Sequence, residues 1–581
     1  MTVPVRHSEP DGPTIQLGVV RIRSIGEEPA GDPLVMEQGG PGGSTIGFFP
    51  NQIRKLVEIL NQRDIVLVEQ RGTQYSIPWL DCSAERNAHN IAVAKGEAED
   101  DGSYLNACKA DWDAQGIDLS AFNDTENAAD IYAAVAALGY DQFNYYGLSY
   151  GTELGQHVMK AAADHPDVLR SVILDSVVPI DIQDQPLKDR IASQALRTMF
   201  ENCAQDATCS QDFPDLEQKT LALLEQMNVT PVVVTATLPS GEKLPMPVTG
   251  SDLFQLMWSN LYSRQTIRQL PGILDTMIQK GDFSWVAKQK TEGLALTPGG
   301  MAEGMHLSMW CPRLGNEPFL GTDLFAPAYP QANIVELALP DYARRCQIMD
   351  VANAEAADFV YPDADIPTLL LSGAMDPATP PQYGEHVAGE LKTAYAYTLP
   401  DAAHNVMLDS PTNCALNMAV AFLADPSETP DSSCVTDLKP VFARRVTPLD
   451  EMTFEPRTVI TGVTASVPTS FADPQGTGLY SDPADPINIP TGLVRFAVVA
   501  ADTVDAALAN LTDSTVIAED QAIGNYRWKI VESSAMMKGV IARGAATAMP
   551  DGEHYLTVML GAPENSADAI FATLLEPILS S

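Results

Sequence analysis

The chain has 581 residues and a formal net charge of −41 at pH 7, and this length is enough for two to four domains of about 150 residues each. The negative charge excludes nucleic acid and anionic membrane surfaces as partners, because both would repel the chain. No run of about 18 apolar residues occurs, so the sequence predicts no membrane span.

A glycine-rich loop follows the first short apolar strand, which is expected at residues 34–37. The loop reads Gly39-Gly40-Pro41-Gly42-Gly43 and comes directly after Gln38. Glycines let backbone N–H groups approach a substrate oxygen closely, as an oxyanion hole requires. The alternative is an ordinary tight turn, which needs fewer glycines, and the Gly-Lys-Ser/Thr ending of a phosphate loop is missing. We therefore expect the N–H groups of Gly39 and Gly40 to contribute to an oxyanion hole.

The most informative motif is Gly147-Leu148-Ser149-Tyr150-Gly151, which lies between an apolar stretch and a helix-like stretch. In this context G-x-S-x-G indicates a nucleophile elbow, because side chains at the glycine positions would collide with neighbouring backbone. Ser149 is therefore the candidate nucleophile. The N–H of Tyr150, the residue after it, is the second expected oxyanion donor.

Two further loops supply an acid and a base, and each comes directly after a predicted strand. Asp376 follows the apolar strand at 368–373, and His404 follows the strand at 394–399. A serine nucleophile needs a histidine to take its proton and a carboxylate to fix the tautomer of that histidine. We predict a triad of Ser149, Asp376 and His404. Its order along the chain, serine then acid then histidine, is one of the known orders for such triads. The rival acid, Asp401, lies too close to His404 along the chain to approach the ring easily.

The alternation of strands and helices predicts an α/β core with a mostly parallel sheet. Its two parts are residues 1–180, which begin with a strand at 14–23 and include a helix at 125–138, and residues 351–435. The helix-rich segment 181–350 is assigned as a cap over the core.

A linker at 428–433 separates the core from a C-terminal α+β domain at 445–581. Helices are expected there at 503–511 and at 567–575, the second ending before Pro577. The domain has no motif for chemistry. Packing on the core, oligomerisation and control of substrate access are its alternative roles, with structural support as the default.

Taken together, these motifs resemble the prolyl-aminopeptidase and tripeptidyl-aminopeptidase family of α/β-hydrolases, over residues 1 to about 435. Besides the glycine loop, the elbow and the two triad loops, the matching segments are Val3-Pro4-Val5 with Asp11-Gly12-Pro13-Thr14-Ile15, Gln70-Arg71-Gly72-Thr73, and Gly304-Met305-His306-Leu307-Ser308 before Cys311. The resemblance implies an α/β-hydrolase fold with a mainly helical cap, and a serine exopeptidase that acts on a small peptide from its amino terminus.

The chain departs from this family at two places. Gln38 stands where the prolyl-aminopeptidase branch has a histidine, and Cys311 is followed by Pro312 and Arg313 where many relatives carry an acidic pair. If those acids hold the α-ammonium of the substrate, this anchor is lost or moved here. Arg313 would instead attract a carboxylate, unless it is only a surface ion-pair partner.

Three functions remain in competition. A serine exopeptidase and a carboxylesterase on the same scaffold differ only in the substrate pocket, and the missing acidic pair favours the ester. A non-catalytic binding protein is disfavoured, because a binder has no need of a complete triad. Candidate pocket residues in the cap, besides Arg313, are Trp258, Met305 and Trp310, although such side chains are more often ordinary core. No metal or organic cofactor is expected, since the triad is self-sufficient.

The eight cysteines are scattered along the chain and not clustered as metal ligands would be. Proximity suggests four disulfides, which is one of 105 pairings: Cys82 with Cys108, Cys203 with Cys209, Cys311 with Cys346, and Cys414 with Cys434. Disulfides would place the enzyme in the periplasm or outside the cell, with its signal peptide removed. The alternative is a cytosolic enzyme with reduced, buried thiols.

Overall fold

The computed structural model describes residues 1–581 except 183–184, 295–299, 314–321, 411, 446–448, 474–475, 482–491, 512, 538–539, 565 and 581. It divides into two compact units, which are described separately. The first comprises Met1–Gln205 and Asp215–Val441, and the second comprises Asp206–Pro214 and Phe442–Ser581. Within the described residues, no helix combines the length and the apolar character that a bilayer crossing requires.

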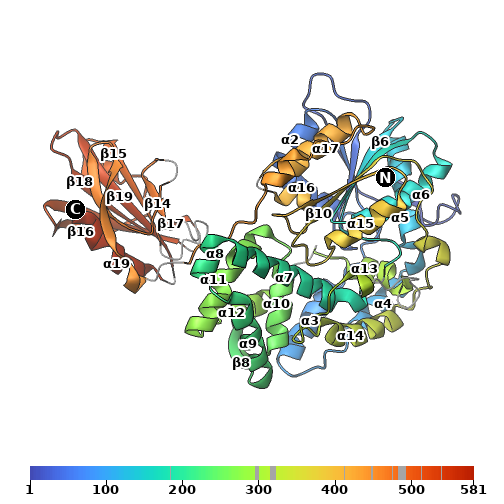
Figure 1. The fold of residues 1–581 in the computed structure, drawn as a ribbon, viewed down its shortest axis with the longest axis horizontal. Coiled ribbons are helices and arrows are strands. Elements are labelled where there is room, and N and C mark those ends of the chain that lie inside the picture. The colour runs from blue at the N-terminus through green and yellow to red at the C-terminus, as the bar shows by residue number, and fades with distance from the viewer. Residues whose placement is uncertain are drawn as a thin grey trace. The chain divides into compact units, whose positions relative to one another are not determined.

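The first unit is built on a seven-stranded sheet whose strands are parallel except for β3 (Figure 1). In spatial order the strands are β11 (Ala394–Leu399), β10 (Thr368–Gly373), β7 (Leu169–Asp175), β6 (Phe143–Leu148), β4 (Leu34–Glu37), β5 (Ile65–Val68) and β3 (Val19–Ile22). Strands β10, β6, β4 and β5 are buried along their whole length because both faces of the sheet are covered. The expected strand at 14–23 is instead two, since Thr14–Gln16 (β2) leaves this sheet to pair with Thr2–Pro4 (β1).

Helices pack on both faces of this sheet (Figure 1). One face carries α4 (Leu105–Ala114), α5 (Asp124–Ala137), α6 (Tyr150–Ala161) and α15 (Pro381–Glu390), and the other carries α2 (Val57–Leu60), α16 (Val406–Asp409) and α17 (Cys414–Ala424). Helix α5 matches the predicted helix closely because its ends are encoded locally. The Asn123 side chain accepts the N–H of Glu126 at its start, and Gly139, with φ of 78°, follows its end.

The segment between β7 and β10 is mainly helical, as expected for a cap. Its helices within the first unit are α7 (Lys188–Gln205), α9 (Leu216–Val229), α10 (Gly250–Asn260), α11 (Arg264–Lys280), α12 (Ser284–Gly293), α13 (Glu303–Trp310) and α14 (Ile334–Met349). The segment also contains a hairpin, Val232–Thr237 (β8) with Lys243–Val248 (β9). The turn between its strands includes Gly241, whose φ is 85°.

The second unit is α+β. Its antiparallel sheet has the order β14 (Leu479–Ser481), β15 (Leu493–Ala500), β19 (His554–Pro563), β18 (Val540–Ala548), β17 (Tyr526–Met537) and β16 (Thr515–Ile523), with a hairpin of β12 (Phe454–Ile460) and β13 (Val463–Pro468). Helix α19 (Ala567–Leu579) packs on β13 and β19. The prediction that this helix ends before Pro577 is wrong. It continues because Ile578 and Leu579 are buried in the core of the unit, which outweighs one lost backbone hydrogen bond. The helix expected at 503–511 shortens to Val504–Ala507 (α18).

All eight cysteines are disulfide-bonded. The bonds Cys82–Cys108, Cys311–Cys346 and Cys414–Cys434 close loops of 26, 35 and 20 residues. Cys203 and Cys209 are each disulfide-bonded as well.

Candidate active site

Ser149 lies at the sharp turn between β6 and α6, with φ of 58° and ψ of −125°. A Cβ at Gly147 would come within 2.1 Å of the carbonyl oxygen of Gly151, and a Cβ at Gly151 within 2.7 Å of that of Glu37. Only glycine fits at either position. The backbone of Ser149 is in a region that costs a non-glycine residue about 1–3 kcal/mol, so the surrounding structure must hold the turn in place.

Hydrogen bonds from neighbouring elements hold this strained turn. The N–H of Ser149 donates to the carbonyl oxygen of Asp175 at 2.9 Å. The Thr152 hydroxyl donates to the carbonyl oxygen of Ser149 at 2.6 Å and accepts the N–H of Val178 at 2.7 Å. The nucleophile candidate is therefore fixed from both the sheet and the helix.

Asp376 and His404 form a pair, and the residues that follow Asp376, 377–379, line the same cavity as Ser149. His404 Nδ1 lies 2.9 Å from Asp376 Oδ2. The other oxygen of this buried carboxylate accepts the N–H groups of Ala378 and Thr379, each at 2.8 Å, and the Thr379 hydroxyl donates to Oδ2 at 2.7 Å. Burial alone would raise the pKa of Asp376, but His404 and these hydrogen bonds outweigh it, so the pKa is lowered.

The same pair sets the charge of the imidazole. Burial alone would lower the pKa of His404, but the Asp376 carboxylate, aided by Asp175, raises it above the ordinary value. Asp401, the rival acid, lies within 3.4 Å of Arg264 instead. The contacts of His404 thus favour Asp376 as its partner.

Asp175 is a site residue that sequence reasoning missed. It is fully buried at the end of β7 and accepts the N–H groups of Val406 and Met407 at 2.7 and 2.8 Å, and the Tyr146 hydroxyl at 2.9 Å. These bonds fix the start of α16, which follows His404. An aspartate that ends an apolar strand was the only signal in the sequence.

The glycine loop lies against the elbow. A Cβ at Gly39 would lie 2.6 Å from Ser149 Cβ and 3.0 Å from the nitrogen of Tyr150. Gly40 has φ of 129°, and Tyr150 begins α6, where N–H groups have no partner within the helix. The structure therefore brings all three predicted oxyanion residues next to Ser149.

Buried side chains support this loop from below. Glu37 accepts from the Thr45 hydroxyl and from Gln70 Nε2, both at 3.0 Å, and Gln70 Nε2 also donates to the carbonyl oxygen of Gln38 at 2.8 Å. Burial raises the pKa of Glu37 well above its ordinary value. Next to Gln70, the fully buried Arg71 binds both oxygens of Asp130, at 2.8 and 2.9 Å. The contacts of Gln70 and Arg71 in the Gln70–Thr73 motif thus have a structural role.

A cavity of about 120 Å³ opens at Ser149. Its lining includes Gly40, Tyr150, Lys188, Trp258, Tyr262, His306 and Trp310. Trp258 Nε1 donates to the carbonyl oxygen of Pro377 at 2.8 Å, and the Tyr262 ring centre lies 5.0 Å from that of His404. The cavity is therefore formed jointly by the mainly helical segment between β7 and β10 and by the rest of the first unit.

Two of the four predicted pocket residues lie elsewhere. Met305 is fully buried in the hydrophobic core, so it does not line the cavity. Arg313 is neither at the cavity nor at the surface: it is buried, pairs with Glu153 and donates to the carbonyl oxygen of Ile180 at 2.9 Å. Arg313, one of the two places where the chain departs from the family pattern, thus has Glu153 as its ion-pair partner. Their spacing along the chain does not reveal this pairing.

Lys188 and His306 line the cavity but were not identified as pocket residues from the sequence. His306 Nδ1 lies 3.0 Å from the carbonyl oxygen of Pro41, and burial lowers the pKa of the ring to about 4. The neutral ring thus contacts the glycine loop from the segment between β7 and β10. No local pattern distinguishes Lys188 from any other lysine at the start of a helix.

Comparison with known proteins gives consistent relatives. A family model described as the alpha/beta hydrolase fold matches residues 32–411. The chain is 24% identical over 460 residues to "Serine protease Hip1" of Mycobacterium tuberculosis, covering 74% of this chain and 86% of that protein. It is 30% identical over 210 residues to "Tripeptidyl aminopeptidase" of Streptomyces lividans, covering 34% and 36%. Among solved structures, proline iminopeptidase of Mycobacterium smegmatis has a TM-score of 0.37 at 15% identity, covering 73% of this chain and 98% of that chain.

Proposed function

Since the chain belongs to the α/β-hydrolase fold family and is a serine hydrolase, we propose that it cleaves short peptides from their amino terminus through an acyl-enzyme. The observation that carries this proposal is the Asp376–His404 pair at 2.9 Å, together with the cavity that residues 377–379 share with the strained Ser149 turn. Relatives named as a serine protease and a tripeptidyl aminopeptidase support the peptide substrate.

Each proposed catalytic group has one task in this mechanism. His404 Nε2 takes the Ser149 hydroxyl proton as the oxygen attacks the substrate carbonyl, while Nδ1–H donates to Asp376. The N–H groups of Tyr150 and of the Gly39–Gly40 turn stabilise the resulting oxyanion. The proton then passes from Nε2 to the leaving amine, and water attacks the acyl-enzyme by the same sequence in reverse. The raised pKa of His404 suits a ring that must hold a proton midway through each step.

A carboxylesterase on the same residues is the second candidate, and one observation favours it. The described residues that line the cavity at Ser149 include one cation, Lys188, and no carboxylate. An α-ammonium group therefore has no anionic partner among the described residues of this lining. An aminopeptidase would need its anchor further along the cap, at the distance of a longer acyl segment.

The disulfides indicate an extracellular or envelope location. We propose a periplasmic or secreted enzyme. The roles of residues 181–350 as a cap and of 445–581 as a separate supporting or oligomerising domain belong to the same proposal.

A matched set of chromogenic substrates tests the function. The set is a free-amine alanyl or prolyl p-nitroanilide, a tripeptidyl p-nitroanilide, the N-blocked twin of each, and p-nitrophenyl butyrate, each with wild type and Ser149→Ala. Cleavage of a free-amine anilide but not of its blocked twin supports the aminopeptidase. Cleavage of the ester alone supports the carboxylesterase, and equal activity of Ser149→Ala refutes the triad.

A further inference from the structure

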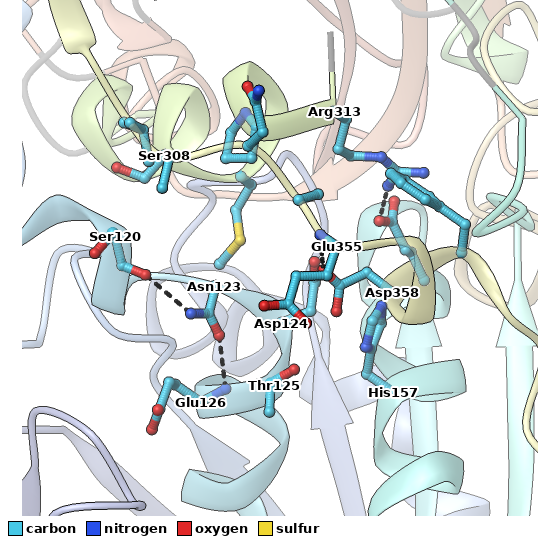
Figure 2. Close-up of a pocket in the computed structure, with 18 of the residues that line it drawn as sticks. Ser120, Asn123, Asp124, Thr125, Glu126, His157, Ser308, Arg313, Glu355 and Asp358 are labelled. Carbon is cyan, nitrogen blue, oxygen red and sulfur yellow. Dashed lines mark hydrogen bonds and ion pairs between the residues drawn. The ribbon is translucent and has the colours of Figure 1, made fainter. Parts of the chain in front are cut away.

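A second and larger cavity, of about 420 Å³, shares no lining residue with the cavity at Ser149 (Figure 2). Asp124, at the start of α5, and Glu153 and His157, on α6, lie on its wall. Glu355 and Asp358 face them from the segment before β10. The proposed mechanism uses none of these five side chains.

Three of these side chains converge on one point. Glu153 and His157 are four residues apart on α6, which puts them on the same face of the helix one turn apart. Asp124 joins them from α5, and one potential ligand atom from each of the three lies within 4.8 Å of the others. Figure 2 shows Asp124 and His157 directed toward the space below Glu355 and Asp358.

Two side chains in this cluster have unused hydrogen-bonding capacity. His157 is 5% exposed, and no hydrogen bond to its ring occurs in the described part of the chain. Glu153 is 2% exposed; its Oε1 pairs with Arg313, but its Oε2 is buried without a hydrogen bond to any described residue. A buried polar atom without a partner is destabilising, so Glu153 Oε2 would gain from a ligand, and the His157 ring is free to contribute a second ligand atom.

We propose that Asp124, Glu153 and His157 bind one divalent cation of the Zn²⁺ type. One imidazole and two carboxylates suit such an ion, and three protein ligands leave a fourth position open to water in the cavity. Ca²⁺ fits less well because it takes six to eight oxygen ligands. Ligand atoms in a tetrahedral Zn²⁺ site lie about 3.4 Å apart, so separations of up to 4.8 Å need a closure of about 1.5 Å.

The charges around the cluster agree with a cation. Two cations act on the cluster: Arg313 pairs with Glu153 Oε1, and Lys160 on α6 interacts electrostatically with His157 and Asp124. Asp124, Glu355 and Asp358 leave the cavity wall with a surplus of carboxylates. Asp124 Oδ1 accepts the Tyr150 hydroxyl at 2.6 Å, so its other oxygen is the one directed to the ion. The bound ion would link α5 to α6, the helix that follows the nucleophile.

Calorimetric titration of chelator-treated full-length protein with ZnCl₂ tests the proposal, with CaCl₂ as a parallel arm. We expect one Zn²⁺ per chain with a Kd of about 10 μM or tighter. His157→Gln and Asp124→Asn should each weaken binding at least tenfold. The matched control is His554→Gln, which removes an exposed histidine paired with Asp551 at 2.8 Å in the other unit. It should leave the affinity unchanged.

Two results would overturn the site: no Zn²⁺ binding to wild type up to about 1 mM, or binding that His157→Gln leaves intact. Equal affinity for Ca²⁺ and Zn²⁺, insensitive to His157→Gln, would identify a merely acidic surface. If a variant fails to fold, anomalous scattering from Zn²⁺-soaked wild-type crystals decides instead. Density between Asp124, Glu153 and His157 supports the proposal, and an ion found only elsewhere, for instance at His404, contradicts it.

Discussion

His404 Nδ1 and Asp376 Oδ2 lie 2.9 Å apart although 28 residues separate them along the chain. Asp376 follows β10 and His404 follows β11, and these strands pair in parallel, with Gly373 opposite Leu399 at their ends. Adjacent parallel strands bring their carboxyl ends to the same edge of a sheet. The pairing of acid and base is thus a direct consequence of strand order.

Asp376→Asn should lower kcat by about 10³–10⁴-fold, because an amide cannot hold the His404 tautomer or stabilise its protonated form. Asp401→Asn is the matched control, since Asp401 is also buried and close to His404 in sequence but is paired with Arg264. We expect it to change kcat less than about tenfold, its effect acting through packing. Steady-state kinetics on the best substrate measures both. A larger loss in Asp401→Asn than in Asp376→Asn would reverse the assignment of the acid.

The acidic limb of the kcat/KM profile should lie above pH 6.5. Catalysis needs the unprotonated His404 ring, and the Asp376 carboxylate raises the pKa of that ring above its ordinary value of 6.5. In Asp376→Asn the limb should move to lower pH, because burial then acts without the opposing charge. A limb that stays in place in the variant would mean that another group controls the profile.

The same shifts predict how the pair contributes to folding. The raised pKa of His404 gives stability that is present below pH 6.5 and lost as pH rises through the folded value. The lowered pKa of Asp376 gives stability present above pH 3.8 and lost as pH falls. Thermal unfolding of wild type and Asp376→Asn across this range should therefore differ most between pH 4 and 6.5. A difference that is constant with pH would contradict the coupling.

Reduction of the disulfides should lower Tm. Loops of 20 to 35 residues restrict the unfolded chain enough to stabilise the native state by about 3 kcal/mol each. Calorimetry with and without dithiothreitol measures the change, and peptide mapping without reductant identifies the pairs. The double variant Cys414→Ala/Cys434→Ala isolates one bond and should lower Tm by several degrees. Free thiols in the unreduced protein would remove the argument for an oxidising compartment.

Much of the elbow and the acid–base pair could be predicted because the signals are local. A side chain at Gly147 would collide with the backbone of Gly151, and a side chain at Gly151 would collide with the backbone of Glu37 on the adjacent strand β4. The strand before His404 begins and ends as predicted, since alternation and flanking turn residues encode it.

What could not be predicted depends on contacts distant in sequence. The link from Asp175 to the residues after His404 spans more than 200 positions, and the partner of Arg313 is 160 residues away. The spacing of residues along the chain predicts neither the Asp175 contacts nor the Arg313 contact. Local rules also failed at Pro577, where burial of the following residues outweighs the preference of proline for a helix end.

Lys188 should select substrates that carry a carboxylate. Lys188 lines the cavity at Ser149, and within the described residues its side chain forms no hydrogen bond or ion pair. The overall charge of −41 repels anions at long range, but salt screens that repulsion over about 8 Å at physiological ionic strength, while a contact within the cavity is screened less. Local attraction should therefore dominate once the substrate is bound.

The comparison pairs p-nitrophenyl hemisuccinate with neutral p-nitrophenyl valerate, and a glutamyl with a glutaminyl p-nitroanilide. Lys188→Met keeps the length of the side chain and removes its charge. It should lower the charged-to-neutral ratio of kcat/KM by about 10–100-fold, as expected from the loss of a charged hydrogen bond worth about 1.5–3 kcal/mol. Lys280→Met, at the exposed end of α11, should leave the ratio unchanged. If wild type prefers the neutral member of both pairs and Lys188→Met does not alter that preference, Lys188 takes no part in selecting the substrate.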